Sequence, residues 1–369
     1  MAGLEPFSVD EIKALTPQPP LPVRGRGGDT RIVPGSPTIR EGGGRGEGAP
    51  RFTYGGSWAT LLQLRTVVAV HVVAAAGLPR PSVFLDDGTF RRIAATIGHI
   101  RSLHPAGAFK TFRLSAAGAD SPVFQRFAAR LSQETGLQPA EDAGDLLLRS
   151  RRGADGGFEL LVRISPRPLA ARSWRVCNRP GALNAAVASI MAGLTQPRPH
   201  DVYLNLASGS GTLLIERAQL GPAARLIGCD LDHEAGECAA RNVEAAGLAV
   251  SGTPGSAQMT TGIPPIELTT LDATALPFPD ASVDALTVDL PFGQLVGSHT
   301  ANAELYPALL NEAARVARPG ARLVAITQQV RLFERSVDAR PWITERVLRP
   351  TIPTSGGAIK PGIYVLRRA

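Results

Sequence analysis

The stretch Tyr203–Ala218, YLNLASGSGTLLIERA, decides how the rest of the chain is interpreted. A short apolar run with strand character leads into a glycine-bearing turn, and helical spacing follows the turn. Gly209 and Gly211 allow the turn to tighten and let backbone amides approach a ligand. Because the positive end of a helix favours a carboxylate or a phosphate, the sequence predicts a cofactor site at this turn. A dinucleotide site is one interpretation, although ASGSGT is not the GxGxxG pattern.

Strand-like and helix-like segments alternate around this turn. The strand-like segments are VYLNLA, RLIGCDLD, IELTTLDA, VDALTVDLPFG and ARLVAITQQ, and the helix-like ones are RPGALNAAVASIMAGLT, GTLLIERAQL, HEAGECAARNVEAAG and NAELYPALLNEAARVARPG. In the first of these helices Pro180 is expected near the start. The alternation predicts an α/β fold with a Rossmann-like, doubly wound parallel sheet. The end of the chain, TERVLRPTIPTSGGAIKPGIYVLRRA, predicts an antiparallel hairpin at the edge of that sheet.

Acidic residues stand where successive predicted strands end. Asp230 follows Gly211 by 19 residues and closes the second strand, where a carboxylate can accept both hydroxyls of a ribose. Asp272 follows the third strand, where an adenine amino group can donate to it. Either residue alone could be an ordinary turn aspartate. Together they predict one ligand site at the carboxyl edge of the sheet.

The fourth strand closes with Val288–Gly293, VDLPFG. An amine conjugated to a base ring is a poor nucleophile because its lone pair is delocalised. If Asp289 and the carbonyl of Leu290 accept its two hydrogens, the lone pair can point at an electrophile. Pro291 fixes the turn, and Phe292 offers a face for stacking an extracted base. The alternative is a strand end followed by an ordinary turn with a core phenylalanine.

Composition narrows the class of protein. A chain of 369 residues has room for two or three domains, and a hydrophobic fraction of 44% excludes a wholly disordered protein. Neither a membrane-spanning run nor a signal region is present, so we expect an intracellular, cytoplasmic protein with no membrane contact. The three cysteines form no CxxC pair. We therefore expect reduced thiols, with no metal site and no disulfide framework.

The positive charge is concentrated in the middle of the chain. Residues 51–180 carry 18 basic and nine acidic side chains, which accounts for the whole excess of a chain whose formal net charge is +7. Nearly all the basic residues are arginines, whose planar guanidinium groups suit phosphates and base edges, so an RNA partner is indicated. A general bias toward alanine, glycine and arginine is the alternative explanation. The candidate RNA contacts are Arg113, Arg149, Arg151 and Arg152.

Three regions follow from these patterns. Residues 1–50 hold eight prolines and ten glycines, and we expect a disordered leader. Residues 51–175 predict a small α+β region with helices in DGTFRRIAATIGHIRSL and PVFQRFAARLSQETGL, and strands in AFKTFRLSAAG, DLLLRSRR and GFELLVRISPRPL. The last two strands are expected to pair through a turn at residues 153–157. Residues 176–369 form the predicted Rossmann-like domain.

The motifs resemble those of a known family. DLPF, Asp289–Phe292, is similar to motif IV, [DN]PP[YF], of class I S-adenosylmethionine-dependent methyltransferases that modify amino groups. Together with SPRPLAARSWRV, NRPGALNAAVA and LNLASGSGTLLIE, the chain resembles the THUMP-domain RNA methyltransferases that make N2-methylguanosine. The resemblance covers roughly residues 58–369 and is more specific in the C-terminal half. Leu290 replaces the first proline of motif IV, and Asn205 stands where the family often has an aspartate.

The resemblance implies a Rossmann-like methyltransferase domain preceded by a THUMP-like, ferredoxin-like RNA-binding domain. It implies that S-adenosylmethionine is the cofactor and that Asp289, Leu290, Pro291 and Phe292 hold the guanine amine. The implied cofactor-binding residues are Asn205, Ala207, Gly209, Gly211, Thr212, Asp230, Leu231, Asp272 and Ala273.

The expected activity is methyl transfer to the N2 amine of a guanosine in structured RNA, with tRNA favoured over ribosomal RNA. No dedicated base is required, because the proton of the methylated amine can leave to water, and His233 and His299 are expected to be surface residues. Two other classes stay open. One is a nucleotide-dependent oxidoreductase, for which DLPF would have no task. The other is a catalytically silent RNA-binding scaffold with a methyltransferase fold.

Overall fold

The computed structural model describes residues 39–40, 51–252, 262–291, 299–338, 341–354 and 357–369, and for residues 39–40, 299–300, 353–354 and 357 it describes the backbone alone. Contacts between residues divide the chain into two compact units, with a break between Ala171 and Arg172. The C-terminal unit also includes the short strands β1 (Ile39–Arg40) and β2 (Arg51–Phe52), which pair antiparallel. Apart from β1, the predicted leader lies outside the described residues.

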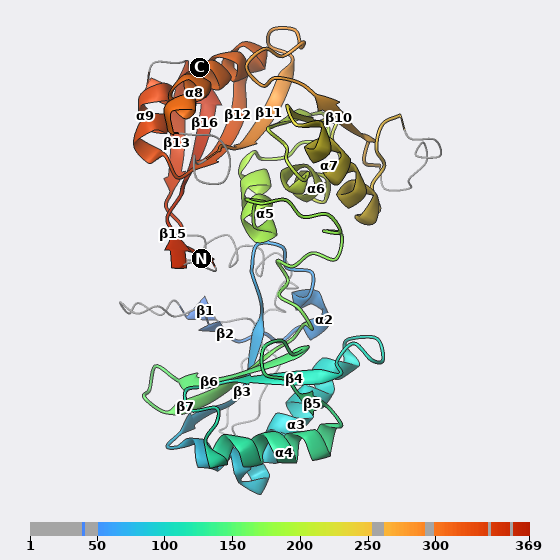
Figure 1. Cartoon of the computed structure of the whole chain (residues 1–369), viewed down its shortest axis with the longest axis vertical. Helices are drawn as coiled ribbons and strands as arrows, with labels where there is room; N and C mark the ends of the chain where they lie inside the picture. The colour runs from blue at the N-terminus through green and yellow to red at the C-terminus, as the bar shows by residue number, and fades with distance from the viewer. Residues whose placement is uncertain (1–38, 41–50, 253–261, 292–298, 339–340, 355–356) are drawn as a thin grey trace, which may run out of the picture. The chain divides into compact units, whose positions relative to one another are not determined.

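A seven-stranded sheet forms the centre of the C-terminal unit (Figure 1). Its strands are β8 (Val202–Leu206), β9 (Arg225–Asp230), β10 (Ile266–Thr270), β11 (Val283–Asp289), β12 (Ala317–Thr327), β13 (Trp342–Leu348) and β16 (Gly362–Arg368). Their order across the sheet is β10-β9-β8-β11-β12-β16-β13. The first five strands run parallel and the last two pair antiparallel. The doubly wound sheet predicted from the alternation is thus confirmed.

Helices cover both faces of this sheet. Helices α5 (Ala185–Leu194), α6 (Thr212–Ala218) and α7 (His233–Ala245) pack on one face, and α8 (His299–Val316) and α9 (Val330–Asp338) pack on the other. Alternate residues of one strand enter the two cores: Leu204 and Leu206 of β8 face α8, and Tyr203, directly before Leu204, faces α6. A strand buried on both sides has an almost continuous apolar sequence, which is why VYLNLA shows no alternation.

The C-terminal hairpin is confirmed, with β13 at the edge of the sheet and β16 between it and β12. Its connection carries a second small hairpin, β14 (Ile352–Thr354) with β15 (Gly357–Ile359), which the sequence did not predict. Helix α9 was not predicted either. The helix predicted to begin near Pro180 begins at Ala185, because Gly181 is left-handed with φ 78° and the Asn184 side chain caps the Ala186 amide at 3.0 Å.

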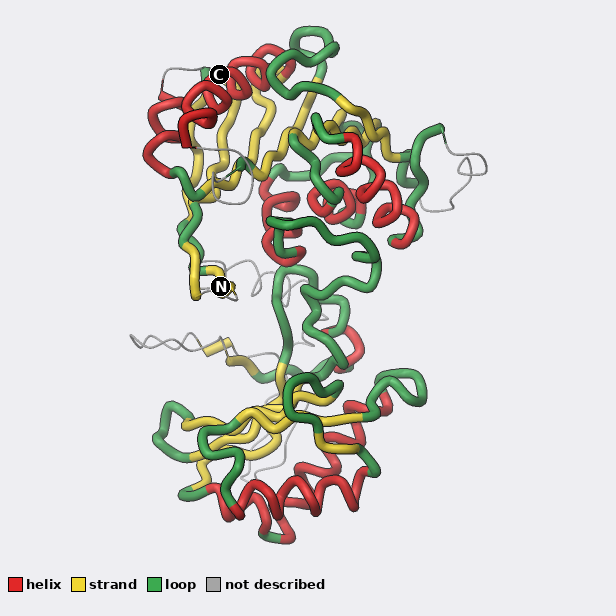
Figure 2. The backbone as a smooth tube through the Cα atoms, viewed as in Figure 1, coloured by secondary structure: helices red, strands yellow, loops and turns green. Residues whose placement is uncertain are grey.

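The N-terminal unit is a five-stranded sheet with its two long helices, α3 (Asp87–Ser102) and α4 (Pro122–Thr135), on one side (Figure 2). Its strands, in the order β3-β7-β6-β4-β5, are β3 (His71–Leu78), β7 (Phe158–Arg163), β6 (Leu146–Arg152), β4 (Thr111–Ser115) and β5 (Gln138–Pro139). Its other helices are α2 (Trp58–Leu61) and the 3-10 helix η1 (Pro81–Leu85). The predicted hairpin of β6 and β7 is present, closed by the Gly153 amide on the Gly157 carbonyl at 2.7 Å. Among the described helices of the chain, none is both long and apolar enough to cross a membrane.

Candidate active site

The acidic residues singled out in the sequence come from strands that lie side by side. Since β10, β9, β8 and β11 are consecutive and parallel, their carboxyl ends share one edge. Asp272 follows β10, Asp230 ends β9, Ala207 follows β8 and Asp289 ends β11. This edge is where open α/β sheets bind ligands. Asn205 on β8 and Thr287 on β11 are 82 residues apart in the sequence, and the topology places them side by side in neighbouring strands.

The glycine turn after β8 has two glycines in left-handed conformation with different surroundings. At Gly209, with φ 54°, a Cβ atom would meet nothing within 4 Å, so the turn is open on that side. At Gly211, with φ 78°, a Cβ would lie 3.1 Å from Ala239 on α7, so a side chain there would be strained and would crowd that helix. Both amides bond within the protein: Gly209 donates to Asp230 Oδ2 at 2.8 Å and Gly211 to the Ser208 carbonyl at 2.9 Å. The Gly209 and Gly211 amides, which were expected to face a ligand, thus form hydrogen bonds that stabilise the turn itself.

Asp230 and Asp272 stand beside each other at the ends of β9 and β10. The Asp230 carboxylate accepts the amides of Gly209 and Asp232, which ties the glycine turn to the end of β9. Leu231, directly after it, is 72% exposed. Asp272 is exposed, and its pKa is lowered by hydrogen bonds from the Thr274 hydroxyl and amide to Oδ1. Part of its role is therefore to form a turn.

Asn205 and Thr212 are both buried. Asn205 Nδ2 donates to the carbonyls of Leu206 and Thr287, each at 3.2 Å, and its Oδ1 has no partner among the described residues. The hydroxyl of Thr212 accepts a bond from Arg175 at 3.0 Å, so it is directed at the segment before α5. Ala207, in the turn, has an unfavourable positive φ of 47°. Ala273, also predicted as a cofactor residue, is half-buried after β10.

Asp289 is the most strongly perturbed carboxyl group of this edge. Its Oδ1 atom is buried and accepts no hydrogen bond from the described part of the chain. Burial raises the pKa of Asp289 from 3.8 to about 7, because the charged form is poorly solvated there. Leu290 is buried and Pro291 half-buried, whereas Phe292, the predicted stacking ring, lies outside the described residues. A buried carboxyl oxygen that receives no hydrogen bond from the described residues is typical of a site where a ligand supplies the donor.

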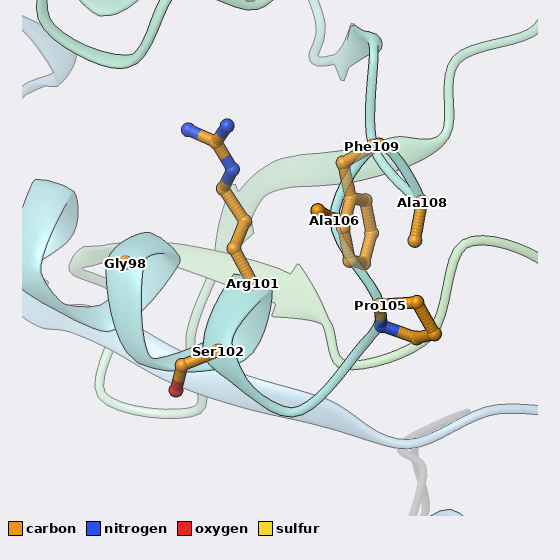
Figure 3. Close-up of a pocket in the computed structure, with 8 residues that line it drawn as sticks. Gly98, Arg101, Ser102, Pro105, Ala106, Ala108 and Phe109 are labelled. Atoms are coloured by element: carbon orange, nitrogen blue, oxygen red, sulfur yellow. The ribbon is translucent and has the colours of Figure 1, made fainter.

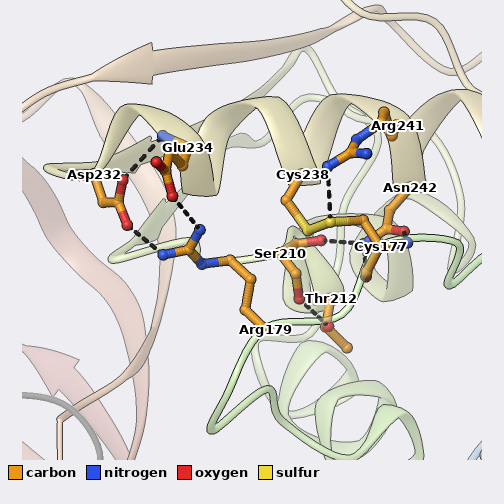
Figure 4. Close-up of a disulfide and its surroundings, with 9 residues drawn as sticks. All are labelled: Cys177, Arg179, Ser210, Thr212, Asp232, Glu234, Cys238, Arg241 and Asn242. Carbon is orange, nitrogen blue, oxygen red and sulfur yellow. Dashed lines mark hydrogen bonds and ion pairs between the residues drawn. A yellow bond between two sulfur atoms is a disulfide. The ribbon is translucent and has the colours of Figure 1, made fainter.

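A disulfide lies close to the glycine turn (Figure 4). Cys177 and Cys238 are joined with their Cα atoms 5.4 Å apart, which corrects the expectation of reduced thiols for these two residues. Cys229 remains a free, buried thiol. Asn242 connects this bridge to the turn, since its Nδ2 donates to the carbonyls of Cys177 and Ser210, both at 2.9 Å. The pairing was missed because 61 residues separate two cysteines that no spacing motif links.

The segment before α5 is also tied to α6 by buried charges. Arg172 pairs with Glu216 through two hydrogen bonds, of 2.9 and 3.3 Å, and the Glu216 side chain is fully buried. Glu216 thus orders this segment, and no signal in the sequence pointed to its partner. Trp174 is buried and packs in the hydrophobic core on the α6 side of the sheet. His233 is exposed, as expected. The side chain of His299 lies outside the described residues.

The arginines proposed to contact RNA lie in the N-terminal unit. Arg113 and Arg149 are exposed on neighbouring strands, on the sheet face opposite the buried Phe112, Leu146 and Leu148. Arg151 shares that face but pairs with the buried Glu159 at 2.7 Å. Arg152 donates to the Gly156 carbonyl and covers the Phe158 ring, so it belongs to the hairpin turn.

The pKa of His71 reflects its burial and the positive charge of this face. Burial, then Arg149, Arg163 and Arg151 in turn, lower its pKa to about 4, so the histidine is neutral at physiological pH. The same arginines would attract a polyanion.

A hollow in the same unit carries no comparable chemistry. It has a volume of about 370 Å³ and lies between the end of α3 and residues 105–109 (Figure 3). Arg101 is the only charged residue of its lining, and its guanidinium donates to the Thr135 carbonyl at 2.7 Å. In the described part of the chain, no group of three or more histidine, cysteine or acidic side chains is placed to hold a metal ion.

Comparison with known proteins agrees with the geometry of the strand ends. Residues 172–352 match the family described as RMKL-like, methyltransferase domain. Over this range the chain is similar to a methyltransferase domain. The matched range contains the whole carboxyl edge from Asn205 to Pro291.

The methyltransferase domain has named relatives. The chain is 32% identical over 190 residues to a Mus musculus protein, tRNA (guanine(6)-N(2))-methyltransferase THUMP3, which covers 51% of the chain and 37% of the mouse protein. It is 28% identical over 210 residues to a Thermus thermophilus tRNA (guanine(6)-N2)-methyltransferase, which covers 56% of each. The chain thus spans only part of the length of these relatives.

Solved structures share the fold. The crystal structure of TrmN from Thermus thermophilus superposes with a TM-score of 0.66, covering 100% of this chain and 97% of that one, at 21% identity. At this identity the likeness establishes the fold of a class I methyltransferase. The substrate has to be argued from the site itself.

Proposed function

We propose that the protein transfers a methyl group from S-adenosylmethionine to the exocyclic N2 amine of a guanosine in structured RNA, with tRNA as the substrate. The observation that carries the proposal is Asp289 at the end of β11, whose Oδ1 atom is buried without a described donor and which is directly followed by the Leu290 carbonyl. The names of the mouse and Thermus relatives support the choice of guanine and of tRNA.

The residues of the carboxyl edge fit the cofactor. The open side of the turn at Gly209 leaves room for the methionine part, and the unpartnered Oδ1 of Asn205 can accept a hydrogen bond from its ammonium group. Asp230 is suited to the ribose hydroxyls and Asp272, with one oxygen outside its turn, to the adenine amine. Leu231, 72% exposed beside Asp230, offers an apolar surface to the adenine ring. Bound there, S-adenosylmethionine supplies an electrophilic methyl group on a positively charged sulfur.

Asp289 and Leu290 prepare the amine. In its charged form the Asp289 carboxylate accepts one amine hydrogen, and the Leu290 carbonyl accepts the other. With both hydrogens held, the nitrogen lone pair points away from the base ring, where it forms the bond to the methyl carbon as the carbon–sulfur bond breaks. The surplus proton on nitrogen leaves to water, so no further base is required. Phe292 as a stacking surface stays a prediction, since it lies outside the described residues.

The N-terminal unit is proposed to bind the RNA. A THUMP-like region of residues 51–175 would contact phosphates through Arg113 and Arg149, which are exposed on one face of its sheet. The target guanosine has to leave its stack to reach Asp289, which costs a few kcal/mol and favours weakly paired or bent RNA. The relatives named as tRNA enzymes, and the arginine excess, together support RNA over a small amine as substrate.

The test is transfer of labelled methyl groups from S-adenosylmethionine into tRNA and, separately, into ribosomal RNA, followed by nucleoside analysis. We expect label in N2-methylguanosine of tRNA, lost in Asp289→Ala and retained in His233→Ala, which changes an exposed side chain. Label confined to ribosomal RNA would overturn the choice of tRNA. No label in either RNA, together with no cofactor binding by calorimetry, would overturn the enzyme and leave an RNA-binding scaffold.

A further inference from the structure

Two side chains of α8 bind the backbone of the DLPF turn. The Pro291 carbonyl accepts a hydrogen bond from Asn302 Nδ2 at 2.9 Å and another from the Tyr306 hydroxyl at 2.7 Å. Asn302 and Tyr306 are four residues apart, so they lie on the same side of the helix, and both are fully buried. A carbonyl that accepts two buried side-chain donors is strongly fixed in direction.

The hydroxyl of Tyr306 is itself fixed. Its oxygen lies 2.9 Å from Thr327 Oγ1, and because the tyrosine proton is used on Pro291, the threonine hydroxyl is the donor in this contact. Thr327 Oγ1 in turn accepts the Gln329 amide at 2.9 Å. The Tyr306 ring packs edge-on against Phe333 with centroids 6.3 Å apart. If the hydroxyl is removed, the ring therefore keeps its packing against Phe333.

The other side of the turn is fixed by Leu290. Its amide donates to the Ile326 carbonyl of β12 at 3.1 Å, a bond that the first proline of the [DN]PP[YF] motif could not make. The amide of Leu290 and the carbonyl of Pro291 are thus both held. Between these two points lies the Leu290 carbonyl, the group that accepts the second amine hydrogen in the proposed reaction. The loss of a rigid proline is offset by hydrogen bonds at both ends of the turn.

We propose that Asn302 and Tyr306 are positioning residues that orient the Leu290 carbonyl, and with it Asp289, toward the amine that is methylated. That the positioned carbonyl faces a reacting amine rests on the proposed function. The way in which the two side chains hold the turn rests on the hydrogen bonds. Neither side chain has to touch the substrate. Because small displacements of a reacting group are costly, their loss should slow methyl transfer without weakening cofactor binding.

The experiment compares Tyr306→Phe with Tyr364→Phe. Tyr364 is a matched control, because its ring also packs on Phe333, at 4.5 Å between centroids, and its hydroxyl is hydrogen-bonded, but to Glu334 and Arg349. We expect kcat for methyl transfer to fall roughly tenfold in Tyr306→Phe and to stay within about twofold in the control. The Kd for S-adenosylmethionine and the KM for RNA should be unchanged in both. Asn302→Ala, made separately, should lower kcat in the same way.

A second measurement does not depend on activity. Hydrogen exchange of the Leu290 amide reports whether the turn stays on β12, and it should become faster in Tyr306→Phe but not in Tyr364→Phe. Unchanged kcat and unchanged exchange in Tyr306→Phe would overturn the inference, as would equal losses in both variants. If the wild-type protein transfers no methyl group to any RNA but the exchange differs as expected, the positioning stands and the proposed function falls.

Discussion

The proposed reaction and the surroundings of Asp289 favour opposite charge states of its side chain. It has to be charged to accept a hydrogen from an amine, yet it lies where burial raises its pKa to about 7. None of the described residues donates a hydrogen bond to its buried Oδ1 atom. The amine of the substrate would supply the missing hydrogen bond, so substrate binding and ionisation of Asp289 should support each other.

This coupling predicts a pH dependence. Below pH 7 the free enzyme holds mainly a neutral Asp289, which is a weaker hydrogen-bond acceptor than the carboxylate, so kcat/KM for methyl transfer should rise with pH through an apparent pKa of about 7. The profile is measured between about pH 5.5 and 8.5 under subsaturating RNA. Asp289→Asn keeps the shape but adds donors in place of acceptors, and its residual rate should lack this limb. A wild-type rate that is constant between about pH 6 and 8 would contradict the assignment.

At the scale of elements, the segment that leads into α5 is joined to α6 by a buried ion pair. Glu216→Gln keeps the size of the side chain but removes the negative charge that faces the Arg172 guanidinium, which is 9% exposed. We expect the free energy of unfolding in urea to fall by about 3 kcal/mol. The control is Glu267→Gln, which breaks the exposed pair of Glu267 with Arg225 and should cost about 0–1 kcal/mol. Equal losses in the two variants would show that burial adds nothing to the pair.

The disulfide belongs to the same scale, since it joins this segment to α7. Its loop of 61 residues predicts a stabilisation of about 2–4 kcal/mol. Titration of the unfolded, unreduced protein with a thiol reagent should detect Cys229 alone, and reduction should expose all three cysteines. Cys238→Ser should lower the Tm to that of the reduced wild-type protein. Three reactive thiols before reduction would show that the bridge does not form.

These elements also show how far the sequence could be interpreted. Strand ends in a parallel sheet meet at one edge, so Asp230, Asp272 and Asp289 could be grouped before any coordinates were known. The bonds from Asn302 and Tyr306 to Pro291 could not, because helix periodicity does not show which distant residue a side chain contacts. Likewise, Cys177 and Cys238 become neighbours only through the packing of α7 against the segment before α5. Local patterns predict elements, whereas contacts between distant elements depend on tertiary packing.

For the whole molecule, the proposed division of labour assigns chemistry to the C-terminal unit and RNA affinity to the N-terminal one. If Arg113 and Arg149 contact phosphates, replacing both with glutamine should weaken tRNA binding and lower the slope of log K against log salt by roughly 1–2. The control is Arg91→Gln, an exposed arginine on α3, which lies outside the face that carries Arg113 and Arg149.

The same variants separate binding from chemistry. Affinity for S-adenosylmethionine, measured by calorimetry without RNA, should be unchanged in the Arg113→Gln/Arg149→Gln variant, because both residues lie outside residues 172–352. At saturating tRNA its kcat should approach that of the wild-type protein, since the loss is one of electrostatic attraction and not of geometry at Asp289. A salt slope that stays the same, or that falls equally in Arg91→Gln, would show that this sheet face does not bind the phosphate backbone. Lost transfer at saturating RNA would instead mean that the arginines help place the target guanosine.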